Sequence, residues 1–382
     1  MTRIADYTMF RRICMVFGLA VSIGIGLAPV RAAELQPGTH AGTLQGALYR
    51  IDIPDHWNGD LVMLMHGYQP VGAKITTPMR AAEPTSVLLK LGYAVAQSQY
   101  ASQGWAVDDA IVDNERLRHY FEHNLAHPKH TYVYGFSLGG LETLATIERY
   151  PHIYSGALVT CGVAVSTADI IADGALTPLV AFDALIPGVL PDLTAPDAPA
   201  FIPPEVFDKA LQAHPQQAAI LEQRLQERPG TLSLSLYYMV LRELEKRAGG
   251  MPVDNRNTVY QGFGDDADFN RKVHRYAGSP AAMAYVQRNA TLTGHIAVPL
   301  VMQWNSFDQT VPARFHDGYP KLVHAAGDDK LLTVLPPVGD GHCNFTDAQT
   351  EAAFTTLVSK ATAGEPEYRH GSGHLPVESN IR

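Results

Sequence analysis

The sequence predicts an α/β fold with a mostly parallel central β-sheet. Short, apolar, β-prone runs alternate with amphipathic stretches of helical length, as in chains whose parallel strands are joined by crossover helices. One transition from strand to helix contains the pentapeptide Gly135-Phe136-Ser137-Leu138-Gly139. In that context, Gly-x-Ser-x-Gly is typical of a tight turn that lifts a serine above the sheet edge. We therefore expect the sheet to be organised around Ser137.

The first half of the chain supplies most of the predicted strands. Residues 44–53 alternate apolar and polar side chains, and we expect the turn Asn58-Gly59-Asp60 to join them, as a hairpin, to the apolar run 61–65. The alternation that follows predicts helix 83–91, strand 93–97, helix 105–121, strand 132–134, helix 141–150 and strand 156–161. The pattern indicates a hairpin followed by parallel strands, with helices on both faces of the sheet.

The alternation lapses after residue 162. Residues 186–215 contain seven prolines, which argues against long regular elements there. Helices are expected at residues 216–226, at 231–246 and from Ser279-Pro280 onwards. We interpret residues 163–290 as a mostly helical insertion.

The sheet resumes after the insertion. The pattern predicts strand 298–304, helix 313–325, strand 330–335 and helix 348–361. Asp347 is placed to cap the start of the last helix. Residues 364–382 are polar and carry glycine and proline, which is typical of a loose tail.

The N-terminus is typical of an export signal. Arginines precede an apolar run over residues 13–30, and Val30-Arg31-Ala32-Ala33 suits cleavage after Ala32. A membrane anchor is the alternative, but glycines and a serine interrupt the run, which is short for a span. We predict an exported protein, periplasmic or extracellular, without a stable membrane anchor. Its expected parts are a signal peptide at 1–32, a core at 33–162 and 291–363, the insertion at 163–290 and the tail at 364–382.

Charge and cysteine content bound the possible partners. The net charge is −9, and residues 1–32 hold four of the 29 basic and one of the 38 acidic residues, which leaves 25 against 37. A chain this acidic argues against nucleic acid or an anionic membrane as partner.

Cys161 and Cys343 remain after cleavage. They can form a disulfide in an exported protein or stay as two buried thiols, and the sequence leaves both open.

A catalytic serine needs a base to remove its proton and an acid to orient that base. Asp308 follows the predicted strand 298–304, at the end where open α/β sheets place their ligand sites. An aspartate that only caps the following helix is the alternative. His342 lies in the loop after the last predicted strand, between Gly341 and Cys343. These two residues are the candidate acid and base for Ser137.

The oxyanion formed by attack on a carbonyl needs two preorganised N–H donors. The backbone of Leu138, directly after the serine, is one candidate. The backbone of Tyr68, which follows His66-Gly67 at the end of the run 61–65, is the other. We expect the His66 side chain to brace this loop, and we interpret Glu142 on the elbow helix as structural rather than as a second acid.

With these residues in place, the sequence resembles the α/β-hydrolase superfamily, in particular exported bacterial serine hydrolases of the esterase and peptidase-like branch. The resemblance runs from about residue 44 to 360, with residues 163–290 where the family inserts its lid. It implies that Ser137, Asp308 and His342 form a catalytic triad, in the chain order of that superfamily. Tannases and feruloyl esterases place one cysteine before the serine and one after the histidine; Cys343 matches, whereas Phe136 takes the other place. The resemblance rests on His66-Gly67, residues 104–109, residues 135–140, Asp308 with Val311-Pro312, and residues 341–343.

The sequence therefore predicts an exported serine hydrolase that cleaves a small-molecule or oligomeric carboxylic ester through an acyl-enzyme. No cofactor and no metal is expected, because no phosphate loop, dinucleotide fingerprint or metal-ligand spacing is present. A peptidase of the prolyl-aminopeptidase type is the nearest alternative. A non-catalytic binding protein on the same fold is the second.

Overall fold

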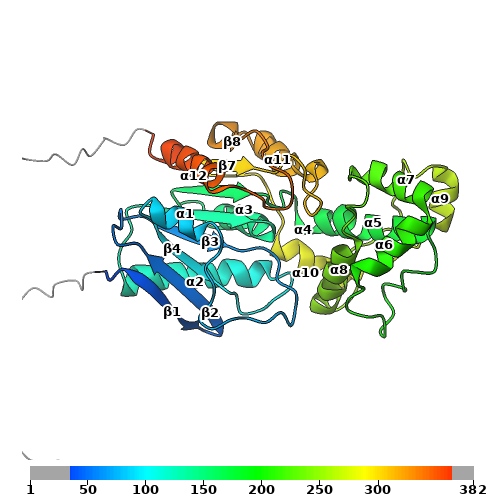
Figure 1. The fold of residues 1–382 in the computed structure, drawn as a ribbon, viewed down its shortest axis with the longest axis horizontal. Helices are drawn as coiled ribbons and strands as arrows, with labels where there is room; N and C mark the ends of the chain where they lie inside the picture. The colour runs from blue at the N-terminus through cyan, green and yellow to red at the C-terminus, as the bar shows by residue number, and fades with distance from the viewer. Residues whose placement is uncertain (1–34, 364–382) are drawn as a thin grey trace, which may run out of the picture. The chain divides into compact units, whose positions relative to one another are not determined.

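The computed structural model describes residues 35–363 (Figure 1). The predicted signal peptide and C-terminal tail lie outside the described residues. Eight strands form one sheet in the order β1-β2-β4-β3-β5-β6-β7-β8. The first two pairings in this order are antiparallel and the others are parallel, which confirms the mostly parallel sheet. The strands are β1 (Gly38–Leu44), β2 (Ala47–Ile53), β3 (Leu61–Met65), β4 (Ala94–Ser98), β5 (Thr131–Phe136), β6 (Gly156–Thr160), β7 (Leu300–Gln303) and β8 (Leu332–Val334).

Helices cover both faces of the sheet (Figure 1). Side chains alternate between the faces along each strand, so Val62 and Leu64 of β3 join the core under α1 and α12. Met65 points to the opposite face, where Thr143 and Thr146 of α3 contact its sulfur. Within residues 35–363 no helix is long and apolar enough to cross a membrane. The helices of the core are α1 (Thr85–Lys90), α2 (Val107–Asn124), α3 (Leu138–Arg149), α11 (Gly318–Ala326) and α12 (Asp347–Ala361).

The hairpin predicted at Asn58-Gly59-Asp60 is wrong. The hairpin of this sheet joins β1 to β2 through Gln45 and Gly46, both at positive φ, and the predicted strand 44–53 spans that turn. β3 pairs instead with β4 and β5. The Asn58-Gly59 turn hydrogen-bonds to other connections, through Gly92 O and Lys129 N. The turn itself is present where its residues predict it, but the pairing partners of a strand are set by contacts far apart in the chain.

The segment between β6 and β7 is mainly helical. Its helices are α4 (Thr167–Asp169), a π-helix (Ile170–Leu176), α5 (Thr177–Leu185), α6 (Pro204–Ala213), α7 (Pro215–Leu225), α8 (Leu234–Ala248), α9 (Asp266–Lys272) and α10 (Pro280–Asn289). The expectation that prolines exclude long elements over residues 186–215 fails at α6. That helix starts at Pro204. The N–H at the first helical position makes no hydrogen bond within the helix, so proline loses nothing there, and its fixed φ suits the first turn.

The cap of α12 also differs from the prediction. Thr346, not Asp347, is the N-cap residue. Its hydroxyl accepts from the Gln349 N–H at 3.3 Å, while the Gln349 side chain accepts from the Thr346 N–H at 2.9 Å. This reciprocal pair is a capping box, and Asp347 is left in the first turn, where its charge suits the helix dipole.

Candidate active site

Ser137 is the single residue between β5 and α3. Its φ of 56° and ψ of −127° are unusual for a residue with a side chain and turn the chain sharply. Two backbone N–H groups, from Gly140 and Val163, donate to the Ser137 carbonyl at 3.0 Å each and brace the turn. The turn is tighter than the sequence indicated. β5 continues through Gly135 to Phe136, and the helix begins at Leu138 rather than at residue 141.

Glycines allow this turn to lie against the end of β3. A Cβ at Gly139 would lie 2.0 Å from the Met65 carbonyl oxygen, and a Cβ at Gly135 would lie 2.0 Å from the Gly139 carbonyl oxygen. A Cβ at Gly67 would meet the Ser137 Cβ at 2.8 Å. Such distances leave no room for any side chain. The N-terminus of α3 therefore directly contacts the loop that follows β3.

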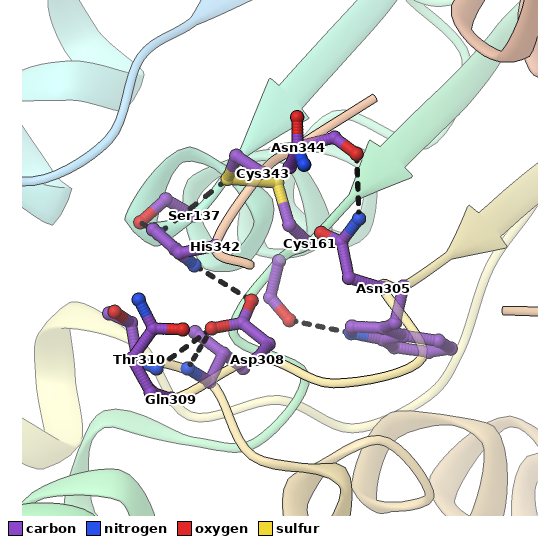
Figure 2. Close-up of polar contacts among 12 residues, drawn as sticks. Ser137, Cys161, Asn305, Asp308, Gln309, Thr310, His342, Cys343 and Asn344 are labelled. Carbon is purple, nitrogen blue, oxygen red and sulfur yellow. Dashed lines mark hydrogen bonds and ion pairs between the residues drawn. A yellow bond between two sulfur atoms is a disulfide. The ribbon is translucent and has the colours of Figure 1, made fainter. Parts of the chain in front are cut away.

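The structure brings Ser137, His342 and Asp308 together (Figure 2). The His342 Nε2 lies 2.8 Å from the Ser137 Oγ, and its Nδ1 lies 2.7 Å from the Asp308 Oδ2. The other carboxylate oxygen of Asp308 accepts from the backbone N–H groups of Thr310 and Val311 at 2.8 and 3.0 Å. Asp308 is 3 % exposed, so water competes little for these contacts. The aspartate thus both orders its own loop and faces the imidazole.

Asn305 connects the loop of Asp308 to the loop of His342. Its Nδ2 donates to the Val338 carbonyl oxygen at 2.9 Å. It also donates to the Asn344 carbonyl oxygen at 3.0 Å (Figure 2). Backbone contacts continue the link, since the Gly341 N–H donates to the Phe307 carbonyl at 2.8 Å. Asn305 is not among the residues predicted from the sequence. The sequence offers one indication of its role, its position after a buried strand, because the carbonyl groups that it binds are more than 30 residues away.

Cys161 and Cys343 form a disulfide (Figure 2). The bond joins the end of β6 to the residue after His342, across a sequence separation of 182. The sequence left the state of these cysteines open. The loop of His342 is therefore tethered covalently on one side and through Asn305 on the other.

One predicted oxyanion donor lies in the turn and the other in the loop after β3. Leu138 is the first residue of α3, and Tyr68 follows Gly67, whose backbone lies against Ser137. The His66 ring stacks on Tyr100 with a centroid separation of 4.0 Å, and its Nδ1 lies 2.7 Å from the Gly67 carbonyl oxygen. The His66 side chain thus packs against Tyr100 and the backbone of its own loop.

An apolar hollow lies beside Ser137. It encloses about 560 Å³, counting the part open to solvent. The segment between β6 and β7 supplies much of its wall, from the π-helix and from α8. No group of three or more His, Cys, Asp or Glu side chains able to hold a metal ion is found within residues 35–363. The lining residues are Tyr68, Trp105, Ser137, Leu138, Val163, Ile170, Ile171, Gly174, Ala175, Leu236, Tyr237, Val240, Thr310, Val311 and Phe315.

Comparison with known proteins finds no matching family model and no curated protein with significant similarity. Among solved structures, feruloyl esterase B from Aspergillus oryzae is 13% identical, with 85% of this chain and 80% of that chain covered and a TM-score of 0.49. An esterase from Pyrococcus furiosus is 13% identical, with 86% and 91% covered and a TM-score of 0.44. Est1E from Butyrivibrio proteoclasticus is 14% identical, with 85% and 98% covered and a TM-score of 0.40.

These similarities are too remote to assign an activity. The fold follows from the chain's own topology. Its sheet has two antiparallel pairings at one edge and parallel pairings elsewhere, and the serine stands on a one-residue turn between β5 and α3. With Asp308 after β7 and His342 after β8, this arrangement is the α/β-hydrolase fold that the sequence predicted.

Breaking the disulfide is expected to destabilise the protein. Cys161→Ser and Cys343→Ser should each lower the free energy of unfolding by about 2–5 kcal/mol, because the cross-link restricts the unfolded chain. Urea denaturation of the two variants and of the wild type, with and without a reductant, measures the effect. The variants should match each other and the reduced wild type. Equal stability of oxidised and reduced wild type would contradict the prediction.

Proposed function

We propose that this protein is a serine hydrolase that cleaves carboxylic esters with Ser137, His342 and Asp308. The observation that carries the proposal is the continuous contact from serine to imidazole to carboxylate, at 2.8 and 2.7 Å. Hydroxyl, base and acid at these distances are what an activated serine requires.

In the first half of the proposed reaction, the ester carbonyl is attacked. The Ser137 Oγ forms a bond to the carbonyl carbon while the His342 Nε2 takes the hydroxyl proton. Asp308 accepts the hydrogen bond from the Nδ1–H, which fixes the ring orientation and stabilises the imidazolium. The backbone N–H groups of Tyr68 and Leu138 donate to the oxyanion. Collapse of the tetrahedral species breaks the ester C–O bond, and His342 returns the proton to the leaving alcohol.

The second half releases the acid. A water molecule gives its proton to His342 and attacks the acyl carbon, and the same two N–H groups bind the new oxyanion. Breakage of the bond to Ser137 then frees the carboxylic acid, and the serine regains its proton from His342. Every proton that His342 takes up in these proposed steps is given back, to the leaving alcohol in the first half and to Ser137 in the second.

The hollow beside Ser137 favours an ester over a peptide with a free N-terminus. An aminopeptidase must pair the ammonium group of its substrate with a carboxylate or carbonyl oxygen, because a buried unpaired charge is costly. The residues that line the hollow include no aspartate and no glutamate. Its wall is instead built from aliphatic and aromatic side chains. We therefore propose an acyl group that is apolar along its length.

We propose that residues 163–290 act as a lid that shapes this acyl site. Leu236 and Val240 of α8, together with the π-helix, line the hollow. The Tyr237 hydroxyl donates to the Gln309 carbonyl at 3.1 Å, which connects α8 to the loop that carries Asp308. Because the insertion supplies wall but no triad residue, it sets which acyl groups enter without taking part in proton transfer.

Removing the nucleophile should abolish turnover in a folded protein. Ser137→Ala is expected to lower kcat on p-nitrophenyl butyrate by roughly three to six powers of ten, and to lose labelling by a fluorophosphonate.

Asp308→Asn should lower kcat by about 10⁴-fold, because the amide favours the wrong imidazole tautomer. Circular dichroism controls for folding. Near-normal turnover by folded Ser137→Ala would overturn the proposed function.

A larger side chain at Ala175 should shorten the accepted acyl chain. Ala175 is 3 % exposed and lines the hollow. In Ala175→Phe, kcat/KM for p-nitrophenyl octanoate should fall by at least about tenfold, while that for the acetate stays within about twofold. Ala172→Phe is the matched control, since Ala172 lies on the same π-helix but does not line the hollow. An equal fall for both esters in Ala175→Phe would argue against an acyl site here.

We also propose that the protein is exported. The arginine-flanked apolar run before Ala33 supports this, and a disulfide at Cys161 and Cys343 suits an oxidising compartment. In an expressing bacterium, the mature protein should be recovered outside the cytoplasm with Ala33 as its first residue. N-terminal sequencing tests this, and a cytoplasmic chain that still carries residues 1–32 would refute it.

A further inference from the structure

A buried polar chain outside the triad lies beneath the loop of His66 and Gly67. It consists of the Glu142 carboxyl, the Tyr100 hydroxyl and the backbone of His66. Glu142 is 0 % exposed and Tyr100 is 5 % exposed. Burying polar groups costs free energy unless they are hydrogen-bonded, and none of the proposed proton transfers uses these groups.

The Tyr100 hydroxyl is the centre of this chain. It donates to the Glu142 Oε2 at 2.8 Å and accepts from the His66 backbone N–H at 2.9 Å. The His66 ring stacks on the Tyr100 ring, which restricts the tyrosine from a second side. The hydroxyl therefore has both a donor and an acceptor in place, and the ring has little freedom to move.

Three elements meet at this hydroxyl. His66 follows β3, Tyr100 lies two residues after the end of β4, and Glu142 lies on α3, whose first residue follows Ser137. Tyr100 connects the loop that presents the Tyr68 N–H to the helix that presents the Leu138 N–H. The two proposed oxyanion donors are thus joined through one phenol and one carboxyl.

Two features of the hydrogen-bonded pair Tyr100–Glu142 are energetically unfavourable: the backbone conformation of Tyr100 and the burial of the Glu142 carboxyl. Tyr100 has a φ of 61°, which is unfavourable for a residue with a side chain and tends to occur where local structure serves function. Burial raises the pKa of Glu142 well above its usual range. The Glu142 Oε1 has no hydrogen-bond partner within residues 35–363. An apolar pair of similar volume would avoid both the unpartnered oxygen and the buried carboxyl.

The packing at Gly67 explains why such a connection matters. The Gly67 backbone already lies against Ser137, since a Cβ added at Gly67 would be only 2.8 Å from the Ser137 Cβ, so the loop has no room to move toward the serine. Movement away is opposed by the hydrogen bond from the His66 N–H to Tyr100. Oxyanion donors act only when they are held at the position where charge develops.

We propose that Tyr100 and Glu142 are positioning residues that hold the Tyr68 N–H at the oxyanion. The proposal rests on the proposed function, since it assigns them a role in the same reaction. Neither side chain touches the substrate. They act through the His66 backbone, so their loss weakens binding of the tetrahedral species more than binding of the ester.

Tyr100→Phe tests the hydroxyl alone. We expect kcat on p-nitrophenyl butyrate to fall by about ten- to a hundredfold, with KM within about threefold. The inhibition constant of phenylboronic acid, which forms a tetrahedral adduct with a catalytic serine, should rise by a similar factor. Tyr134→Phe is the matched control, because the buried Tyr134 hydroxyl pairs with the Thr160 hydroxyl at 3.0 Å rather than with the oxyanion loop. That variant should keep kcat.

Two substitutions at Glu142 test whether the acceptor of the Tyr100 hydrogen bond matters. Glu142→Gln retains a carbonyl oxygen that can accept from Tyr100, so its kcat should stay within about threefold of wild type. Glu142→Leu removes the acceptor and should match Tyr100→Phe. If Tyr100→Phe and Tyr134→Phe have equal kcat, or if Tyr100→Phe raises KM alone, the positioning role is refuted. Activity that survives Ser137→Ala would instead refute the proposed function, so the two failures are distinguishable.

Discussion

The candidate site depends on close backbone contact between the start of α3 and the end of β3. Gly139 and Gly67 make that contact possible, since a side chain at either position would overlap the Met65 carbonyl or Ser137. The contact places the helix N-terminus, the positive end of the helix dipole, beside the loop that carries Tyr68. Ser137, on a one-residue turn at that junction, therefore lies next to both the N-terminus of α3 and the loop that carries Tyr68.

The histidine is held differently, because it stands on a loop rather than on a helix or strand. It lies 205 residues from its serine partner. Among the contacts that hold its loop, three come from other strands of the sheet: the Asp308 carboxylate, the disulfide at Cys343 and the Asn305 amide. All three arrive from the ends of β6 and β7. The carboxyl edge of the parallel strands thus supplies both the proposed reacting groups and the residues that hold them in place.

The sequence predicted those parts that depend on short-range pattern. The buried strands, the Gly-x-Ser-x-Gly turn and the order of Ser137, Asp308 and His342 could be read from spacing and composition. The partner of β3, the disulfide and the role of Asn305 depend on residues far apart in the chain, which no local pattern specifies. The helix at Pro204 was missed for another reason: proline is unfavourable inside a helix but favourable in its first turn.

The proposed chemistry and the proposed acyl selectivity reside in different parts of this chain. The triad residues and the proposed oxyanion donors all follow core strands β3, β5, β7 and β8. The wall of the acyl hollow comes largely from the π-helix and α8, which bring no aspartate or glutamate to it. The hydrogen bonds of Asn305, and separately those of Tyr100 with Glu142 and His66, are made within the core. Tyr237 is the wall residue that bonds to the Asp308 loop, through the Gln309 carbonyl, so substitutions at the other wall residues are expected to alter the apolar fit without displacing the proposed reacting atoms. Substitutions beneath the oxyanion loop should have the opposite effect, since they disturb donor geometry while leaving the apolar wall unchanged.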